Sequence, residues 1–114
     1  MYDPTLAHLA NLAPKIRTPA TYLIIAARNV GIPLIVSSSR RSVWEQTKLV
    51  LSGRSRTLNS AHLRGQAFDV DVVGWKREAL PTAFLSSLGE YGEGLGLTWG
   101  GRFRTLYDPG HFEL

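Results

Sequence analysis

The stretch from Ala67 to Val73 most constrains how this chain can fold, because apolar and acidic side chains alternate along it. In an extended segment, alternate side chains point to opposite faces, so the two carboxylates, Asp69 and Asp71, share one face. The other face consists of Phe68, Val70 and Val72. The stretch therefore predicts a half-buried strand. Its acidic face also carries Ala67 and Val73, so it is not simply a wet surface, and a carboxylate there needs a partner.

Shorter signals on either side predict the rest of the fold. We expect a first helix up to Pro14 and a second that is capped by Thr18, begins at Pro19 and ends near Gly31. Further helices are expected over 42–52 and 81–92, and further strands over 33–38, 97–99 and 111–114. This order predicts an α+β fold in which a small antiparallel sheet is flanked by helices.

Composition bounds the classes of protein that remain. Hydrophobic residues make up 44% of the 114 residues and charged residues 19%, which excludes a largely disordered chain. The apolar runs are far shorter than the ~20 residues needed to span a bilayer, so we expect no membrane insertion. The 13 Lys and Arg residues exceed the 9 Asp and Glu residues and give a net charge of +4, which predicts attraction to a polyanion of some kind.

The chain has no cysteine, so any metal must be held by His, Asp or Glu. His62 lies in a polar loop seven residues before Asp69, and an Asp-Pro-Gly turn at 108–110 delivers His111 onto the last predicted strand. Two imidazoles and a carboxylate form a ligand set that suits Zn²⁺, and three protein ligands leave a fourth position for water. A water bound there would have a pKa of about 7 and would act as a nucleophile at neutral pH.

These residues also carry a family resemblance. Ser-x-His-x-x-Gly-x-Ala-x-Asp at 60–69, followed by Asp-x-x-His-x-Glu at 108–113, resembles zinc peptidases related to VanY-like D-alanyl-D-alanine carboxypeptidases and to phage L-alanyl-D-glutamate endopeptidases. Upstream, Ser-Ser-Arg-Arg-Ser at 38–42 with Gln46 resembles the family's Ser-Gly-Tyr-Arg-Ser segment and its following Gln. Trp-Gly-Gly at 99–101 also fits, and all the motifs occur in family order.

The resemblance implies a role for each matching residue. His62, Asp69 and His111 would bind one Zn²⁺, Asp108 would be the general base, and Arg41 would hold the substrate carbonyl oxygen or oxyanion. Many relatives carry Glu at the position of Asp108, whereas the endopeptidase branch accepts Asp there. This favours the endopeptidase branch.

Alternatives stay open at two of these positions. Asp71 lies on the same strand face as Asp69 and is the rival ligand, although the motif spacing selects Asp69 and leaves Asp71 a structural role. Ser-Arg replaces the family's Gly-Tyr, which leaves either Arg40 or Arg41 as the oxyanion partner. The register to Gln46 favours Arg41.

Other residues would bind substrate or support the site. Glu113 shares a strand face with His111 and would either orient its imidazole or pair with an arginine. Ser60 would form a hydrogen bond within the site or shape the loop, and Gln46 is a further candidate for substrate contact. Trp99 would lie either at the edge of a substrate groove or in the core. We expect His8 in the first helix to be simply exposed.

The resemblance implies a zinc-dependent peptidoglycan hydrolase that cleaves an amide bond of the stem peptide. The L-alanyl-D-glutamate bond, cleaved in the manner of a phage endolysin, is the first expectation, and D-alanyl-D-alanine carboxypeptidase activity is the alternative. A remoter alternative is a non-catalytic zinc-containing cell-wall-binding module, since hedgehog domains share the fold. We expect no nucleic-acid partner, because no recognition helix or RNA-binding aromatic sheet is evident.

Length and the first residues complete the expectations. We expect residues 1–114 to form a single catalytic domain without a separate cell-wall-binding domain, acting as a monomer on peptidoglycan. No signal peptide is evident at the N-terminus. This predicts accumulation in the host cytoplasm before release to the cell wall, through a holin if the protein comes from a phage.

Overall fold

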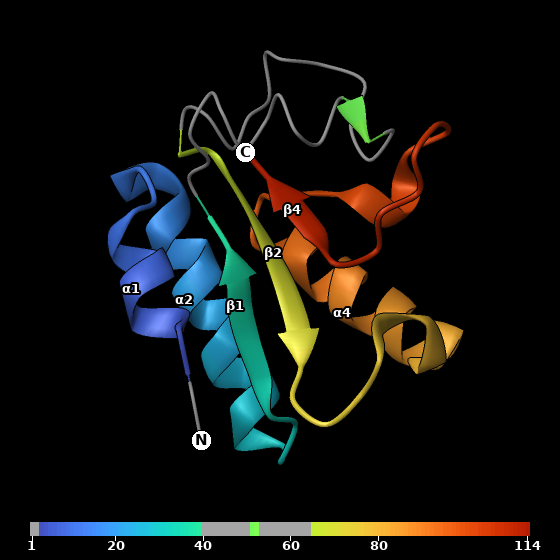
Figure 1. Ribbon diagram of the computed structural model, residues 1–114. Helices are drawn as coiled ribbons and strands as arrows, with labels where there is room; N and C mark the ends of the chain where they lie inside the picture. Colours follow the sequence, from blue (N-terminus) through green and yellow to red (C-terminus); the bar gives the residue numbers. More distant parts are fainter. Residues whose placement is uncertain (1–2, 40–50, 53–64) are drawn as a thin grey trace.

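Four strands form one antiparallel sheet in the computed structural model, which describes residues 3–39, 51–52 and 65–114. The spatial order is β1-β2-β4-β3, so β2 and β4 occupy the centre (Figure 1). The strands are β1 (Leu34–Ser38), β2 (Ala67–Val72), β3 (Thr98–Trp99) and β4 (His111–Glu113). Each strand expected from the sequence is present at its predicted place.

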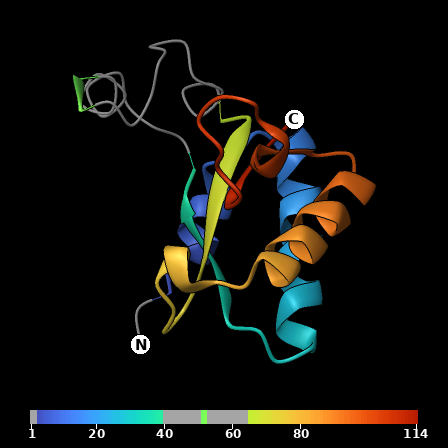
Figure 2. The ribbon, with the colours of Figure 1, turned by 90° about the vertical axis from the view of Figure 1, so that its right-hand side faces the viewer.

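Helices pack against this sheet. They are α1 (Thr5–Ala10), α2 (Pro14–Asn29) and α4 (Thr82–Gly94), with short 3₁₀ segments η2 (Arg77–Ala79) and η3 (Gly100–Arg102). The view from the side shows α2 and α4 on the same side of the sheet (Figure 2). The prediction of an α+β fold with a small antiparallel sheet flanked by helices is confirmed. The helix expected over 42–52 lies outside the described residues except for its last two positions.

The core lies between the sheet and these helices. Phe68 of β2 stacks on Phe112 of β4, with ring centroids 5.5 Å apart, and both side chains are fully buried. Helix α4 approaches them closely because it presents glycine to the sheet: a Cβ on Gly92 would overlap the Phe112 ring, and one on Gly89 would overlap Trp99. The apolar face of β2 is therefore buried as its alternation predicts.

The second helix begins earlier than the sequence predicts. Pro14 is at its first turn and Pro19 lies inside it, although proline at Pro19 removes a helical hydrogen bond. Two interactions favour the longer helix: Ile16 is fully buried, and the Arg17 guanidinium donates hydrogen bonds to the carbonyls of Leu9 and Leu12. The expectation that Thr18 caps this helix was therefore wrong.

Across the described ranges, no helix is both long enough and apolar enough to cross a membrane.

Candidate metal centre

The centre of the site is a cross-strand pair on the face of the sheet opposite the phenylalanines. Asp69 of β2 lies directly opposite His111 of β4 in the antiparallel register, so their side chains project from the same face. The Nδ1 atom of His111 is 3.1 Å from Oδ1 of Asp69. The two residues are 8% and 6% exposed, so this is a buried polar pair.

Asp108 joins this pair from the turn that precedes β4. Its backbone N–H donates to the carbonyl of Gly100, and its own carbonyl accepts from the N–H of His111, both at 3.1 Å. Gly100 fits because of its missing side chain, since a Cβ there would overlap the Asp108 carbonyl oxygen. In the same turn, the carbonyl of Gly110 accepts a hydrogen bond from the N–H of Val70 on β2 at 2.9 Å. Backbone bonds thus fix the turn to both η3 and the sheet.

Trp99 fixes the same turn from the core. Its indole N–H donates to the carbonyl of Pro109 at 2.8 Å, while the side chain is buried and the Arg102 guanidinium lies 5.3 Å from the ring centroid. Trp99 thus lies in the core with its indole N–H bonded to the turn, which is one of the two placements that the sequence left open. A contact of Trp99 with substrate stays a prediction.

Together these elements form a three-residue group that can hold a metal ion. One ligand atom from each of Asp69, Asp108 and His111 lies within 4.8 Å of the other two. Neighbouring ligand atoms of a tetrahedral Zn²⁺ are about 3.3–3.6 Å apart, given metal–ligand bonds of about 2.0–2.2 Å. The 3.1 Å between His111 Nδ1 and Asp69 Oδ1 is close to this spacing. The donor types therefore suit zinc, and the spacing of the His111–Asp69 pair is close to that of two zinc ligands.

Glu113 occupies the other side of the His111 ring. Its Oε1 accepts a hydrogen bond from Nε2 of His111 at 2.8 Å. Burial would lower the pKa of His111, but hydrogen bonds and charge from Asp69, together with Glu113 and Asp108, outweigh it and raise this pKa. With Nε2–H committed to Glu113, Nδ1 is the nitrogen available to a metal ion. This arrangement, a ligand imidazole oriented by a carboxylate, is common in metal sites.

Asp71, the rival ligand, is engaged elsewhere. Both of its carboxylate oxygens accept hydrogen bonds from Arg77, at 2.9 and 3.0 Å. It is not a member of the three-residue group. The two carboxylates share one face of β2 but have different partners: Asp71 pairs with Arg77, and Asp69 pairs with His111.

Four of the residues expected in the site lie outside the described residues. They are Arg41, Gln46, Ser60 and His62, and their roles, like the choice between Arg40 and Arg41, stay predictions. Asp69, Asp108, His111 and Glu113 are brought together as described above.

Sequence reasoning missed three neighbours of the site and misjudged one histidine. Arg77 was not considered, Gly100 was seen only as part of a motif, and the Phe103 ring, 5.6 Å from the His111 ring, carried no signal. His8 is not simply exposed: its Nδ1 is 2.7 Å from the hydroxyl of the buried Ser39. Such contacts join distant segments, which a local pattern does not show.

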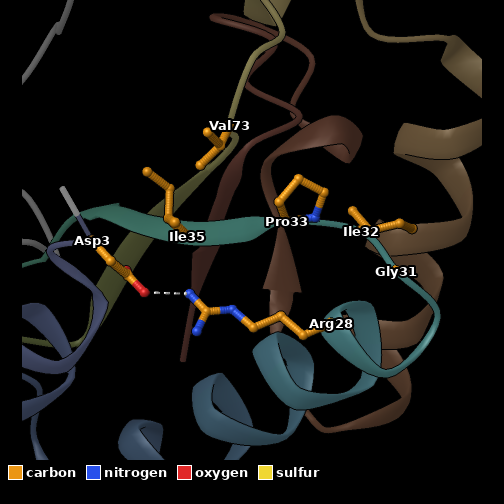
Figure 3. A pocket seen from close by; sticks show the side chains of 7 residues that line it. All are labelled: Asp3, Arg28, Gly31, Ile32, Pro33, Ile35 and Val73. Atoms are coloured by element: carbon orange, nitrogen blue, oxygen red, sulfur yellow. Dashed lines mark hydrogen bonds and ion pairs between the residues drawn. The ribbon is translucent and has the colours of Figure 1, made fainter. Parts of the chain in front are cut away.

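A pocket of about 340 Å³ lies apart from the metal centre, where β1 begins and β2 ends (Figure 3). An ion pair of Arg28 with Asp3 at 3.0 Å borders it, and Ile35 and Val73 form part of its apolar wall. It shares no lining residue with the three-residue group.

Comparison with known proteins decides the family. A family model described as D-alanyl-D-alanine carboxypeptidase matches residues 53–114, more than half of the chain. The chain belongs to the D-alanyl-D-alanine carboxypeptidase family. The chain is similar to the L-alanyl-D-glutamate peptidase of Listeria phage A118, with 29% identity over 117 aligned residues. The alignment covers 99% of this chain and 41% of the relative, so this member of the family spans about two fifths of that protein's length.

Solved structures share the fold of this family member. The L-Ala D-Glu endopeptidase ChiX of Serratia marcescens superposes with a TM-score of 0.69 and 27% identity, over 96% of this chain and 85% of that one. The LD-carboxypeptidase LdcB gives a TM-score of 0.70 at 22% identity, over 98% and 66%. The vancomycin-resistance D,D-pentapeptidase VanY, in complex with Zn(II), gives 0.65 at 19% identity, over 90% and 71%. The last two likenesses establish the fold alone.

Proposed function

We propose that this chain is a zinc-dependent peptidase that hydrolyses an amide bond in the stem peptide of bacterial peptidoglycan, and that the L-alanyl-D-glutamate bond is the one cleaved. The observation that carries the proposal is the convergence of Asp69, Asp108 and His111 within 4.8 Å, in a chain of the D-alanyl-D-alanine carboxypeptidase family. The choice of bond is supported by the L-alanyl-D-glutamate peptidase and endopeptidase among its relatives.

In this proposal His62, Asp69 and His111 hold a single Zn²⁺ ion. When bound, the ion polarises the scissile carbonyl and makes water acidic enough to lose a proton at neutral pH. Glu113 accepts the hydrogen bond of His111 Nε2–H and so keeps Nδ1 directed toward Asp69.

Asp108 is proposed as the general base and acid. Hydrolysis adds the hydroxyl of water to the carbonyl carbon, breaks the C–N bond and leaves a carboxylic acid and an amine. The Asp108 carboxylate would accept the proton of the attacking water and pass it to the leaving nitrogen. Its place beside Asp69 and His111, on a turn fixed by the Gly100 carbonyl, supports this role. Arg41 would donate hydrogen bonds to the oxyanion of the substrate.

The test is digestion of purified peptidoglycan with and without a chelator, followed by mass analysis of the fragments. The proposal expects new L-alanine C-termini and D-glutamate N-termini, lost on chelation and restored by added Zn²⁺. His111→Ala should lose both bound zinc and activity and serves as the matched control. Cleavage that is insensitive to the chelator would remove the zinc mechanism.

A second candidate function has its own support. The matching family model is described as D-alanyl-D-alanine carboxypeptidase, and the same metal centre would serve to remove a terminal D-alanine. Release of free D-alanine in the same digestion, without new D-glutamate N-termini, would favour this activity.

The setting of the reaction is also part of the proposal. We propose that residues 1–114 act as one catalytic domain, because the described helices and strands share a single hydrophobic core, and that this domain is a monomer. The phage source of one relative supports an endolysin that accumulates in the host cytoplasm and reaches the cell wall through a holin. Gel filtration would test the monomeric state. Comparing lysis of host cells by added protein with lysis by protein expressed inside them, with and without a holin, would test the route to the cell wall.

A further inference from the structure

Arg77 lies on the acidic face of the sheet, next to the metal centre, and has no part in the function proposed above. It begins η2, shortly after β2 ends, and its Nε and Nη2 atoms donate to the two carboxylate oxygens of Asp71 at 2.9 and 3.0 Å. Asp71 is two residues from Asp69 on the same face of β2. This bidentate bond fixes the plane of the guanidinium on the side of the sheet where the metal ligands lie.

The guanidinium also lies against the turn that carries Asp108 and His111. A Cβ on Gly110 would lie 3.8 Å from both Cζ and Nε of Arg77, an ordinary van der Waals distance, so the guanidinium lies beside this turn. The hydrogen bonds with Asp71 raise the pKa of Arg77, and the charges of Asp71, Asp69 and Asp108 add to this against the effect of burial. Arg77 is thus within electrostatic reach of two members of the metal centre.

One edge of the Arg77 guanidinium is not used in the pair with Asp71. Nε and Nη2 are used by Asp71, and within the part of the chain that the structure describes Nη1 donates no hydrogen bond. The Arg77 side chain is 42% exposed, so a ligand can approach it. An arginine held in place by a carboxylate on one edge, with the other edge open, is well arranged to bind a second carboxylate.

We propose that Arg77 binds a carboxylate of the substrate next to the scissile amide bond. This assignment rests on the proposed function, and it names what part of the substrate the site selects. A D-glutamyl residue that contributes the nitrogen of the scissile bond carries a carboxyl group on its Cα, one carbon from that nitrogen. The open edge of the Arg77 guanidinium would donate charge-assisted hydrogen bonds to this carboxyl group.

Two matched peptides test the assignment. Both contain the L-alanyl-D-glutamyl bond; one has a free α-carboxylate on the D-glutamyl residue and the other has a carboxamide there. The zinc-loaded protein should cleave the free acid with a kcat/KM about ten- to a hundredfold higher, the range of a charge-assisted hydrogen bond. Arg77→Gln should lower this ratio to near one, chiefly by slowing cleavage of the acid, and Arg77→Lys should restore part of it. Arg104→Gln removes an equal charge from an exposed position and should leave the ratio unchanged.

Binding to an inactive protein provides a second readout. The Asp108→Asn protein, with and without Arg77→Gln, is titrated with both peptides by calorimetry, and only the protein with Arg77 should prefer the acid. A preference that survives Arg77→Gln, or equal treatment of the peptides by the protein with Arg77 intact, would overturn the assignment. If neither peptide is cleaved while the Arg77-dependent binding preference persists, the proposed function fails and the carboxylate site stands.

Discussion

On one face of β2 and β4, Phe68 stacks on Phe112 in the buried core, and on the other face the neighbouring residues Asp69 and His111 lie 3.1 Å apart. Both pairs are set by the same register, in which Phe68 lies opposite Phe112 and Asp69 opposite His111. The apolar face contributes to stability by removing ring surface from water. The polar face buries a carboxylate and an imidazole, which costs stability unless a metal ion or a proton lies between them.

This difference shows how a small sheet separates packing from chemistry without separate elements for each. The phenylalanine pair fixes the backbone, and the backbone places the metal ligands. A change on the apolar face should therefore lower stability first, whereas a change on the polar face should lower metal binding or turnover and leave folding largely intact.

Asp108→Asn should give the largest effect and should spare the fold. The amide has nearly the same shape but no longer accepts a proton at neutral pH, so kcat should fall by about a hundredfold to ten-thousandfold. Zinc content and melting temperature should stay near those of the unchanged protein, because the turn is fixed by backbone bonds from Gly100 and Val70. Stopped-time assays on a soluble stem peptide and metal analysis of the purified variant measure both quantities.

Loss of zinc from the Asp108→Asn variant would instead make Asp108 a ligand, which its place in the three-residue group also allows. His111→Ala is the matched control, since it removes a group that both alternatives count as a ligand. Added Zn²⁺ should raise the melting temperature of the Asp108→Asn protein and not that of the His111→Ala protein.

Phe112→Ala should give the largest effect on stability. The ring is fully buried between Phe68 and Gly92, so its removal should lower the free energy of unfolding by about 3–5 kcal/mol. Urea denaturation in the presence of a chelator measures this without a contribution from bound metal. Phe112→Leu keeps part of the side-chain volume, so its free energy of unfolding should lie between those of the unchanged protein and Phe112→Ala. A variant that loses zinc affinity but keeps its unfolding free energy would contradict the division between the two faces.

The sequence predicted the elements whose signal is local. The alternation in Ala67 to Val73 has a period of two, which only an extended segment satisfies, so β2 and the face of Asp69 could be read directly. The start of α2 could not be read, because it depends on the burial of Ile16 against residues distant in the chain. The preference for proline at a first helical position pointed to Pro19, and tertiary packing overrode it.

The candidate site divides in the same way. Asp69, Asp108 and His111 stand out by residue type and motif, and their convergence follows from the pairing of β2 with β4. The bond from the Trp99 indole to the Pro109 carbonyl, and the pairing of Asp71 with Arg77, depend on side-chain directions that the motifs do not specify. His62 and Arg41 rest on their motifs and stay predictions.

Glu113→Ala should have a moderate effect, which we expect on zinc affinity and not on folding. The carboxylate accepts the Nε2–H of His111 at 2.8 Å, so its loss should weaken zinc affinity by about 10–100-fold, as for other carboxylates behind a ligand histidine. Competition with a chelating dye measures the affinity. Glu113→Gln retains a hydrogen-bond acceptor and should recover part of it. Equal zinc affinity in all three proteins would show that Glu113 does not orient the ring.

Trp99→Phe should have the smallest effect and tests where the two regions meet, since the Trp99 ring belongs to the core while its indole N–H reaches the turn of Asp108 and His111. Phenylalanine keeps most of the buried ring surface and removes the donor to the Pro109 carbonyl, a bond of about 0.5–1.5 kcal/mol. If that bond mainly positions the turn, kcat should fall by up to about tenfold, with little change in KM. If the residue only fills the core, the unfolding free energy should fall while kcat stays the same. Parallel measurement of kcat, KM and urea denaturation separates the two outcomes.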